Sequence, residues 1–369
     1  MKLVFVSNYI NHHQIPLSEE LFKLTDGRYR FIQTEPMEEE RIKLGWDEGA
    51  ASKPYVIKYH DAPEGCKKLI MEADCVIFGG TDDESYIMPR LEAGLFTIRY
   101  SERIYKTGRW KFITPRGLIK KYHDHTRFRH NPVYLLCSGA FVKGDFKLIH
   151  AYKGKMLKFG YFPETYEYTD LHEERCNNTS INILWVGRFI GWKHPEMMIK
   201  LNDALKGTGA ACKITMVGTG PLLSVLKEIA GDEINFTGPK TPVEVRELMR
   251  RADIFIITSD QQEGWGAVIN EAMNSGCTVI ASDKIGAAPY LIKNNENGIL
   301  FKSKSQSDLN KKVLSLIYTP EKRHDLGNKA YETITHAWNA KVAAERLIKF
   351  IDDPEHRIPE HESGPVSKA

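Results

Sequence analysis

Residues 254–273 read IFIITSDQQEGWGAVINEAM, and this stretch decides the fold that we expect for the chain. Its apolar start, 254–258, is typical of a strand buried on both faces, and residues 268–274 have the apolar spacing of a helix. Between them lies a polar loop that contains Glu263 and two glycines. A strand followed by a loop and a helix is the repeating unit of a parallel sheet, which binds ligands at the carboxyl ends of its strands.

The same alternation extends over most of the 369 residues. A polar, acidic segment at 166–180 divides the chain into two halves, each long enough for a core of its own. The pattern predicts the α/β class, with two doubly wound Rossmann-like domains at 1–170 and 180–336, an amphipathic helix at 337–352 and a flexible tail at 353–369. Further strands are expected at 3–6, 75–78, 96–100, 133–137, 181–186, 213–217 and 278–281, and further helices at 195–205, 222–229 and 242–251.

Composition narrows the class of protein. The chain has 51 Lys+Arg against 48 Asp+Glu, a net charge of +3, and 42% hydrophobic residues, which excludes a disordered chain. No apolar run approaches the roughly 20 residues that span a bilayer, and the first residues lack the apolar core of a secretory signal. We therefore expect a cytoplasmic protein. The six cysteines are scattered, so neither a disulfide framework nor a metal site is expected.

Two loops after predicted strands carry residues suited to a phosphate. The loop 187–193 follows the strand 181–186 and contains Arg188 and Lys193, which together would clamp a diphosphate. Two solvated surface charges are the alternative interpretation. Gly218 and Gly220 follow the strand 213–217, where glycines permit a close backbone approach to a ligand.

The loop of the opening stretch gives the strongest signal. Glu263 precedes the helix, and Glu271 lies inside it among core-like residues, where a carboxylate needs a partner. A carboxylate accepts two hydrogen bonds from a vicinal diol such as that of a ribose. A carboxylate that serves only the helix dipole is the alternative for Glu263. A fourth loop, 283–289, also contains glycine, and the four loops together predict a groove for a nucleoside diphosphate.

These motifs resemble those of the retaining glycosyltransferases of family 4 (glycosyl transferases group 1), which have the GT-B fold. The resemblance covers about residues 181–301, including Asn297-Gly298. It implies that Arg188 and Lys193 hold the diphosphate of the donor and that Glu271 holds its ribose hydroxyls. It also implies that the transferred sugar and phosphate meet Glu263 and the main-chain N–H groups of Gly264, Trp265, Gly266, Ala267 and Val268.

The family implies an activity and a role for each of the two domains. The first domain would supply the acceptor side of a cleft and the second the donor side, with the last helix returning to the N-terminal domain. The reaction would be a metal-independent, retaining transfer of a hexose from a nucleotide-diphosphate sugar, such as a UDP-sugar, to a hydroxyl of a saccharide or lipid-linked acceptor. Its setting would be bacterial cell-surface polysaccharide or glycolipid synthesis. No cofactor is expected besides the donor substrate.

Two other functions stay open. A GT-B sugar phosphorylase or nucleotide-sugar epimerase would show phosphate-dependent or acceptor-free chemistry. A non-catalytic protein that binds a nucleotide or recruits a partner enzyme is the third possibility, and the absence of a thermal shift with any nucleoside diphosphate would favour a scaffold.

The first half offers further candidates for the cleft. The loop 7–16 has no glycine, so its backbone is a poor cradle for phosphate, and Asn11, His12 and His13 would supply side chains instead. Relatives often place a histidine after the strand that corresponds to 96–100, where this chain has Glu102 and Arg103. Surface or structural roles are the alternative for the two histidines.

The segment 99–130 concentrates positive charge. Ten Lys/Arg stand against two acidic residues, a net charge of +8, and aromatic and aliphatic residues are interleaved. Such a mixture suits an anionic bilayer, so we predict a peripheral location on the inner face of the cell membrane. No nucleic-acid motif accompanies the segment, and a solvated basic face is the alternative. The residues expected to contact the membrane are Arg109, Trp110, Lys111, Lys120 and Lys121.

Overall fold

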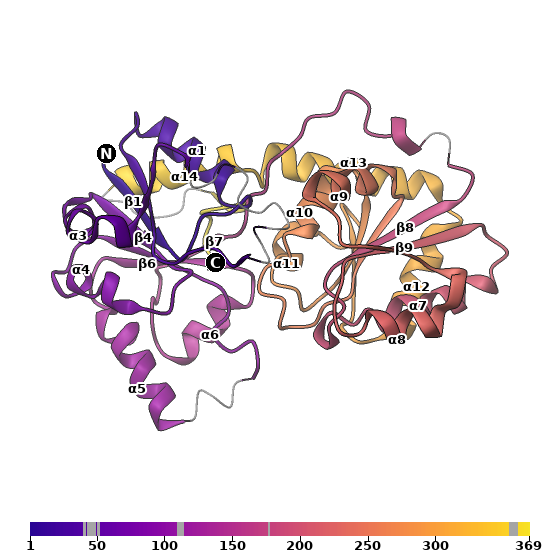
Figure 1. The fold of residues 1–369 in the computed structure, drawn as a ribbon, viewed down its shortest axis with the longest axis horizontal. Coiled ribbons are helices and arrows are strands. Elements are labelled where there is room, and N and C mark those ends of the chain that lie inside the picture. Colours follow the sequence, from indigo (N-terminus) through magenta and orange to yellow (C-terminus); the bar gives the residue numbers. More distant parts are fainter. Residues whose placement is uncertain (40–41, 43–48, 50–51, 109–113, 176–177, 354–360) are drawn as a thin grey trace. The chain divides into compact units, whose positions relative to one another are not determined.

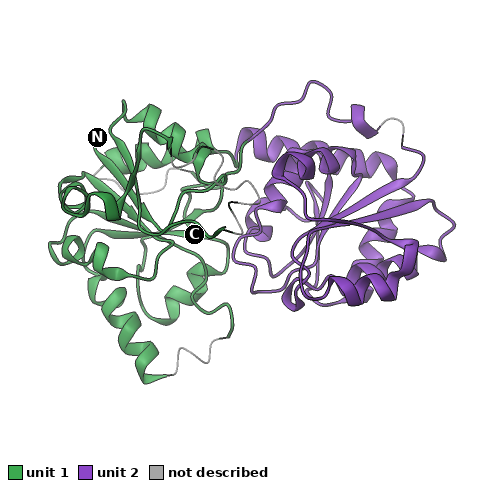
Figure 2. Ribbon diagram, in the orientation of Figure 1, with its two compact units in different colours: residues 1–164, 338–369 green, residues 165–337 purple. Residues whose placement is uncertain are grey.

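The chain folds into two compact units, shown in different colours in Figure 2: residues 1–164 with 338–369, and residues 165–337. The computed structural model describes all residues except 40–41, 43–48, 50–51, 109–113, 176–177 and 354–360. Each unit is a parallel sheet covered by helices (Figure 1). Every predicted strand is present with ends that differ by at most one residue, which confirms the α/β class. Among the described residues, no helix is both long and apolar enough to cross a bilayer.

The first unit contains a seven-stranded sheet with the order β3-β2-β1-β4-β5-β6-β7. All five residues of the central strand β1 are buried, because helices cover both faces of the sheet and both sets of side chains enter the core. The strands are β1 (Leu3–Ser7), β2 (Tyr29–Gln33), β3 (Val56–Lys58), β4 (Cys75–Phe78), β5 (Thr97–Ser101), β6 (Val133–Ser138) and β7 (Met156–Phe159). The helices are α1 (Ile15–Leu24), α3 (Pro63–Glu72), α4 (Met88–Glu92), α5 (Pro115–Asp124), α6 (Val142–Leu148) and α14 (Ala340–Asp352).

The second unit contains a six-stranded sheet with the order β10-β9-β8-β11-β12-β13. Helix α9 begins with a capping box, in which Thr241 and Glu244 satisfy each other's main-chain N–H groups. The strands are β8 (Ile181–Val186), β9 (Cys212–Val217), β10 (Asn235–Gly238), β11 (Ile254–Ile257), β12 (Thr278–Ser282) and β13 (Ile299–Phe301). The helices are α7 (Glu196–Lys206), α8 (Leu223–Ala230), α9 (Pro242–Arg251), α10 (Val268–Asn274), α11 (Ala288–Leu291), α12 (Gln306–Ile317) and α13 (Pro320–His336).

Helix α14 belongs to the first unit although it follows the second in sequence, as predicted. It packs beside α1 (Figure 1), and the ring of Phe350 meets that of Tyr134 on β6 edge-on at 5.1 Å. The side chain of Asn339 caps its first turn by accepting a hydrogen bond from the Val342 N–H at 2.9 Å. Just before the helix, buried Trp338 stacks on Phe162 with ring centroids 6.4 Å apart.

Two boundaries differ from the sequence predictions. The polar segment from residue 165 is part of the second unit, where the buried guanidinium of Arg175 donates to the carbonyl oxygens of Gly276 and Ser275 at 2.8 and 2.6 Å. The flexible tail is wrong for residues 361–369, because Val366 and Ser367 are buried and exchange main-chain hydrogen bonds with Lys158 on β7. Residues 354–360 of the predicted tail lie outside the described part of the chain.

Candidate functional site

Four loops of the second unit lie at one edge of its sheet. They follow β9, β8, β11 and β12, which are consecutive neighbours in the sheet order, so their carboxyl ends stand side by side. All strands run parallel, and the crevice at the carboxyl ends is where such sheets bind ligands. The topology therefore brings together the second-unit residues that the sequence singled out.

An ion pair joins two of these loops. The Lys193 ammonium lies 2.7 Å from Oε2 of Glu263, and both side chains are largely buried, at 13% and 15% exposure. The hydroxyl of Ser259 donates to the same carboxylate oxygen at 2.9 Å. The main chain is fixed as well, because the Thr258 hydroxyl donates to the carbonyl oxygen of Lys193 at 2.6 Å. The ammonium of Lys193 is thus held in place while two of its three protons stay available to another acceptor.

Arg188 lies on the same loop as Lys193 and differs from it in exposure. Its side chain is exposed, and among the described residues it forms no ion pair. The backbone beside it is fixed, since the Phe189 N–H donates to the carbonyl oxygen of Thr219 at 2.9 Å and the Gly187 N–H to that of Val217 at 3.0 Å. A guanidinium on a rigid loop is suited to binding an anion from solvent.

The two glycines after β9 allow the backbone of a neighbouring loop to approach closely. A Cβ on Gly218, where φ is +131°, would lie 2.0 Å from the carbonyl oxygen of Gly187, and one on Gly220 would lie 2.7 Å from that of Phe189. The Gly218 N–H is already donated to the carbonyl oxygen of Gly238. The close approach predicted for a ligand at Gly218 is thus made by the loop that carries Arg188.

The loop before α10 combines a buried side chain with available main-chain donors. The indole of Trp265 is buried and donates to Oδ1 of Asn270 at 2.9 Å, so this side chain is part of the core and not a ligand contact. Among the described residues, the N–H groups of Gly266, Ala267 and Val268 donate to no main-chain acceptor. The contacts predicted for Gly264–Val268 therefore rest on main-chain atoms.

Glu271 lies in the first turn of α10, directly after the loop. Burial raises the pKa of its carboxyl to about 7, and the positive charge of Arg246 acts in the opposite direction. Near neutral pH the side chain is thus divided between its charged and neutral forms. Only the charged form accepts hydrogen bonds with both oxygens, as the proposed ribose contact requires.

The sequence reasoning missed a second charged group beside this site. Buried Asp260 accepts hydrogen bonds from the Lys304 ammonium at 2.9 Å and the Gln262 N–H at 3.0 Å, and His194 Nε2 lies 3.4 Å away. Burial opposes ionisation, yet these hydrogen bonds hold the pKa of Asp260 below its usual range. Asp260 lies in the loop that follows β11, and a carboxylate in a loop after a strand was the available signal.

In the first unit, the three loop candidates lie between β1 and α1. Oδ1 of Asn11 accepts from the His13 N–H at 3.0 Å, so Asn11 shapes the turn. The rings of His12 and His13 lie 3.8 Å apart, and His13 stacks on Tyr161. Burial lowers the pKa of His12 to about 4 and that of His13 well below 6.5, so both are neutral at physiological pH. Whether either meets a substrate stays a prediction.

Glu102 and Arg103 have partners within the protein. Arg103 donates through Nε and Nη2 to both carboxylate oxygens of Asp145, at 3.2 and 3.1 Å, and Asp145 is fully buried. The guanidinium is therefore held by a buried partner, and whether Arg103 also meets the donor sugar stays a prediction. Glu102 accepts from the Tyr161 hydroxyl at 2.7 Å and pairs with Lys106.

The basic segment 99–130 is less exposed than its net charge indicates. Arg99 forms a buried bidentate pair with Glu84, so Arg99 and Arg103 both point inward. Helix α5 carries exposed basic residues of this segment, among them Lys120. On the same helix, Leu118, Ile119 and Tyr122 are 43%, 59% and 52% exposed. Arg109, Trp110 and Lys111 lie outside the described residues.

Comparison with known proteins identifies the class to which this site belongs. Residues 169–333 match the family model of the glycosyl transferases group 1, which confirms the resemblance seen in the loop motifs. The matched range coincides closely with the second unit.

Two curated relatives match over a similar length of the chain. An uncharacterized glycosyltransferase of Methanocaldococcus jannaschii is 29% identical over 185 residues, which cover 49% of this chain and 47% of that protein. A GDP-mannose-dependent alpha-(1-6)-phosphatidylinositol monomannoside mannosyltransferase of Mycobacterium tuberculosis is 23% identical over 180 residues, 46% of each chain. The matched part of the chain thus spans about half the length of these relatives.

A solved structure extends the likeness to both units. The crystal structure of HepE from Anabaena in complex with UDP aligns with 95% of this chain and 100% of its own, with a TM-score of 0.69 at 15% identity. At this identity the likeness shows the fold alone, and it confirms the predicted GT-B fold.

Proposed function

We propose that the chain transfers a sugar from a nucleoside diphosphate sugar to a hydroxyl group of a saccharide or lipid-linked acceptor. The observation that carries this proposal is the largely buried Lys193–Glu263 pair, next to exposed Arg188, at the carboxyl edge of a group 1 glycosyltransferase sheet. Two cations and a row of N–H groups at one sheet edge match the two negative charges of a diphosphate.

The chemistry that we propose is retaining and needs no metal ion. The bond between the anomeric carbon and the diphosphate oxygen breaks, and the acceptor oxygen forms a bond to the same face of that carbon. The acceptor proton passes to an oxygen of the departing phosphate, so no protein nucleophile is required. Arg188 and Lys193 stabilise the charge that grows on the leaving group, and Glu271 holds the ribose.

A panel of nucleotide sugars tests the donor site. We expect one of them to raise the melting temperature and to release its nucleoside diphosphate on turnover. Arg188→Ala should lower kcat about 10²-fold, the usual effect of removing one charge-stabilising donor. Lys213→Ala, an exposed lysine on β9, is the matched control and should leave the rate unchanged. Equal rates in the two variants would exclude Arg188 from the site, and no shift with any nucleotide would exclude the donor site.

For the acceptor we propose a substrate at an anionic membrane, in cell-surface polysaccharide or glycolipid synthesis. The mannosyltransferase relative acts on a phosphatidylinositol mannoside by its name, and α5 offers the surface for docking. Only Asp124 of this helix is buried, and Leu118 and Ile119 stand beside Arg116 and Lys120. Apolar side chains that enter the interface and cations that meet lipid phosphates each contribute about 1 kcal/mol.

Sedimentation with vesicles of phosphatidylglycerol tests the membrane surface. We expect the double variant Leu118→Ser, Ile119→Ser to bind about 10-fold more weakly than the wild type, because roughly 1–2 kcal/mol of apolar burial is lost. The control is Val225→Ser, Ile229→Ser, which changes two similarly exposed residues of α8. Equal losses in both variants, or no binding by the wild type, would contradict the docking role of α5.

A further inference from the structure

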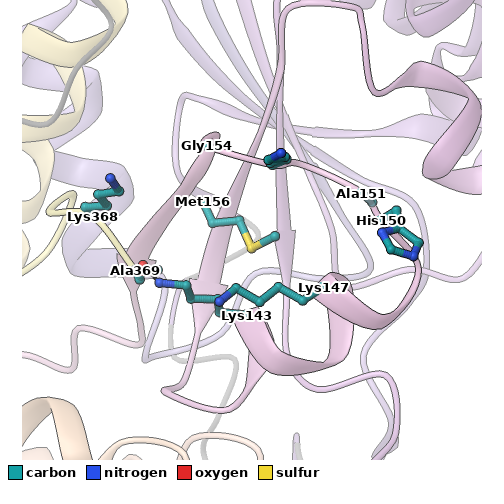
Figure 3. Close-up of a pocket in the computed structure, with 9 residues that line it drawn as sticks. Lys143, Lys147, His150, Ala151, Gly154, Met156, Lys368 and Ala369 are labelled. Atoms are coloured by element: carbon teal, nitrogen blue, oxygen red, sulfur yellow. Dashed lines mark hydrogen bonds between the residues drawn. The ribbon is translucent and has the colours of Figure 1, made fainter.

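A cavity of about 370 Å³ lies in the first unit, away from the loops described above (Figure 3). It is bounded by α6, by the loop 149–155 and by the last two residues of the chain. That loop enters β7 at its amino end, which is the edge of the sheet opposite to the carboxyl ends of the strands. The cavity is therefore separate from the edge at which an α/β sheet normally binds its substrate.

The residues that line the cavity are mostly basic. The four lysines Lys143, Lys147, Lys153 and Lys368 line it together with His150, and none of the described lining residues is Asp or Glu. Lys143 donates to the main-chain oxygen of Ala369. Among the described residues, the other three lysines form no ion pair. Lys147, Lys153 and Lys368 are thus left to attract an anion from solvent, and a bound anion would offset their positive charge.

The loop that forms one wall is rigid and strained. His150 and Tyr152 both have φ of +53°, a left-handed conformation that non-glycine residues rarely adopt and that costs about 1–3 kcal/mol each. Tyr152 is buried, and its hydroxyl lies 2.8 Å from Nδ1 of His125. The Lys155 N–H donates to the carbonyl oxygen of Tyr152 at 2.9 Å and closes the turn. Buried contacts thus hold this wall in a conformation that the local backbone does not favour.

The last residues of the chain form a second wall. The Lys158 N–H donates to the Ser367 carbonyl oxygen at 2.7 Å, and the Ala369 N–H donates to that of Met156 at 3.0 Å. This pairing along β7 places Lys368 at the rim and Met156 inside the cavity (Figure 3). The cationic rim and the apolar floor are both formed before any ligand arrives.

We propose that this cavity binds a phosphate-bearing ligand, a phosphomonoester or a diphosphate, with its anionic group at Lys147, Lys153 and Lys368 and its uncharged part on Met156. The volume lies within the range of small-molecule sites. Charge-assisted hydrogen bonds from lysines suit phosphate oxygens. The phosphate is carried either by a soluble sugar or polyol phosphate or by the headgroup of an anionic lipid, because both present the same chemistry.

Isothermal titration of the whole protein with glycerol 3-phosphate and with inorganic phosphate tests the cavity. We expect one site, weakened about 10-fold or more in Lys147→Gln, Lys153→Gln, because two of its cationic contacts are removed. The matched control is Lys23→Gln, Lys58→Gln, two exposed lysines elsewhere in the first unit. Vesicles of phosphatidylglycerol form the second arm, and binding to vesicles alone would assign the phosphate to a lipid.

Two variants with opposite expected effects separate this proposal from the donor site. The cavity variant should bind the phosphate probes more weakly and keep its affinity for the nucleoside diphosphate. Arg188→Ala should bind the nucleoside diphosphate more weakly and keep its affinity for the phosphate probes. A wild type that binds neither the soluble probes nor the vesicles, or a cavity variant that binds them as the wild type does, overturns the proposal. Failure of nucleotide binding alone would instead contradict the proposed transferase activity.

Discussion

Replacing Lys193 with methionine separates two roles that its ammonium could have, one in stability and one in catalysis. The ammonium lies 2.7 Å from Glu263, and both side chains are at most 15% exposed. Removing it leaves a carboxylate in a poorly solvated place, where the Ser259 hydroxyl donates to it at 2.9 Å. An unpaired charge in a fully buried pair costs about 3–5 kcal/mol, so about 2 kcal/mol is expected for this partly exposed one.

A catalytic role of Lys193 predicts a loss of kcat that a second substitution does not restore. If the ammonium stabilises the leaving diphosphate, its loss should reduce kcat about 10²- to 10³-fold. Adding Glu263→Gln removes the unpaired charge, so the double variant should recover most of the lost free energy of unfolding. It should not recover kcat, because the cation that meets the diphosphate is still absent.

Urea denaturation and initial rates of nucleotide release measure the two effects on the same four proteins: the wild type, both single variants and the double variant. Rates are compared at a urea-free condition where every variant is folded by circular dichroism. A double variant that regains both stability and turnover would show that Lys193 only neutralises Glu263. That result would refute its proposed contact with the donor.

Three further predictions follow from other contacts. Because the pKa of Glu271 is raised to about 7, the fraction of its carboxylate form increases as the pH rises through 7. The KM for the nucleotide sugar should therefore fall over that range, and Glu271→Gln should abolish this pH dependence. Arg103→Met leaves Asp145 buried without its partner, so urea denaturation should show a free energy of unfolding lower by about 3 kcal/mol and donor affinity should be unchanged. Reduced donor affinity would show that Arg103 also contributes to the site. Gly218→Ala places a Cβ 2.0 Å from the Gly187 carbonyl oxygen, so it should lower the melting temperature and also weaken nucleotide binding by displacing the Arg188 loop; normal values of both would contradict this packing.

Much of the fold was predictable because it depends on local patterns. Strands that lie inside a covered sheet are unbroken apolar runs, and all of those that we predicted are present. The missed strands β7 and β10 are short and lie at sheet edges, where one side is open and polar residues are tolerated, whereas the missed inner strand β2 is interrupted by Arg30. Their residues give no apolar run to recognise.

The sequence by itself determined which loops are candidates for the site, because parallel strands place their carboxyl ends at one edge whatever their order. Only the tertiary structure decided which charged side chains pair within the protein. Arg103 and Arg188 both follow a strand. Arg103 pairs with Asp145, 42 residues later, whereas Arg188 stays exposed. The tertiary structure likewise pairs Lys193 with Glu263, which is 70 residues later in the sequence. It also places Gly218 against the backbone of a neighbouring loop, where a larger residue would not fit. These contacts depend on which strands become neighbours, and no local spacing encodes that order.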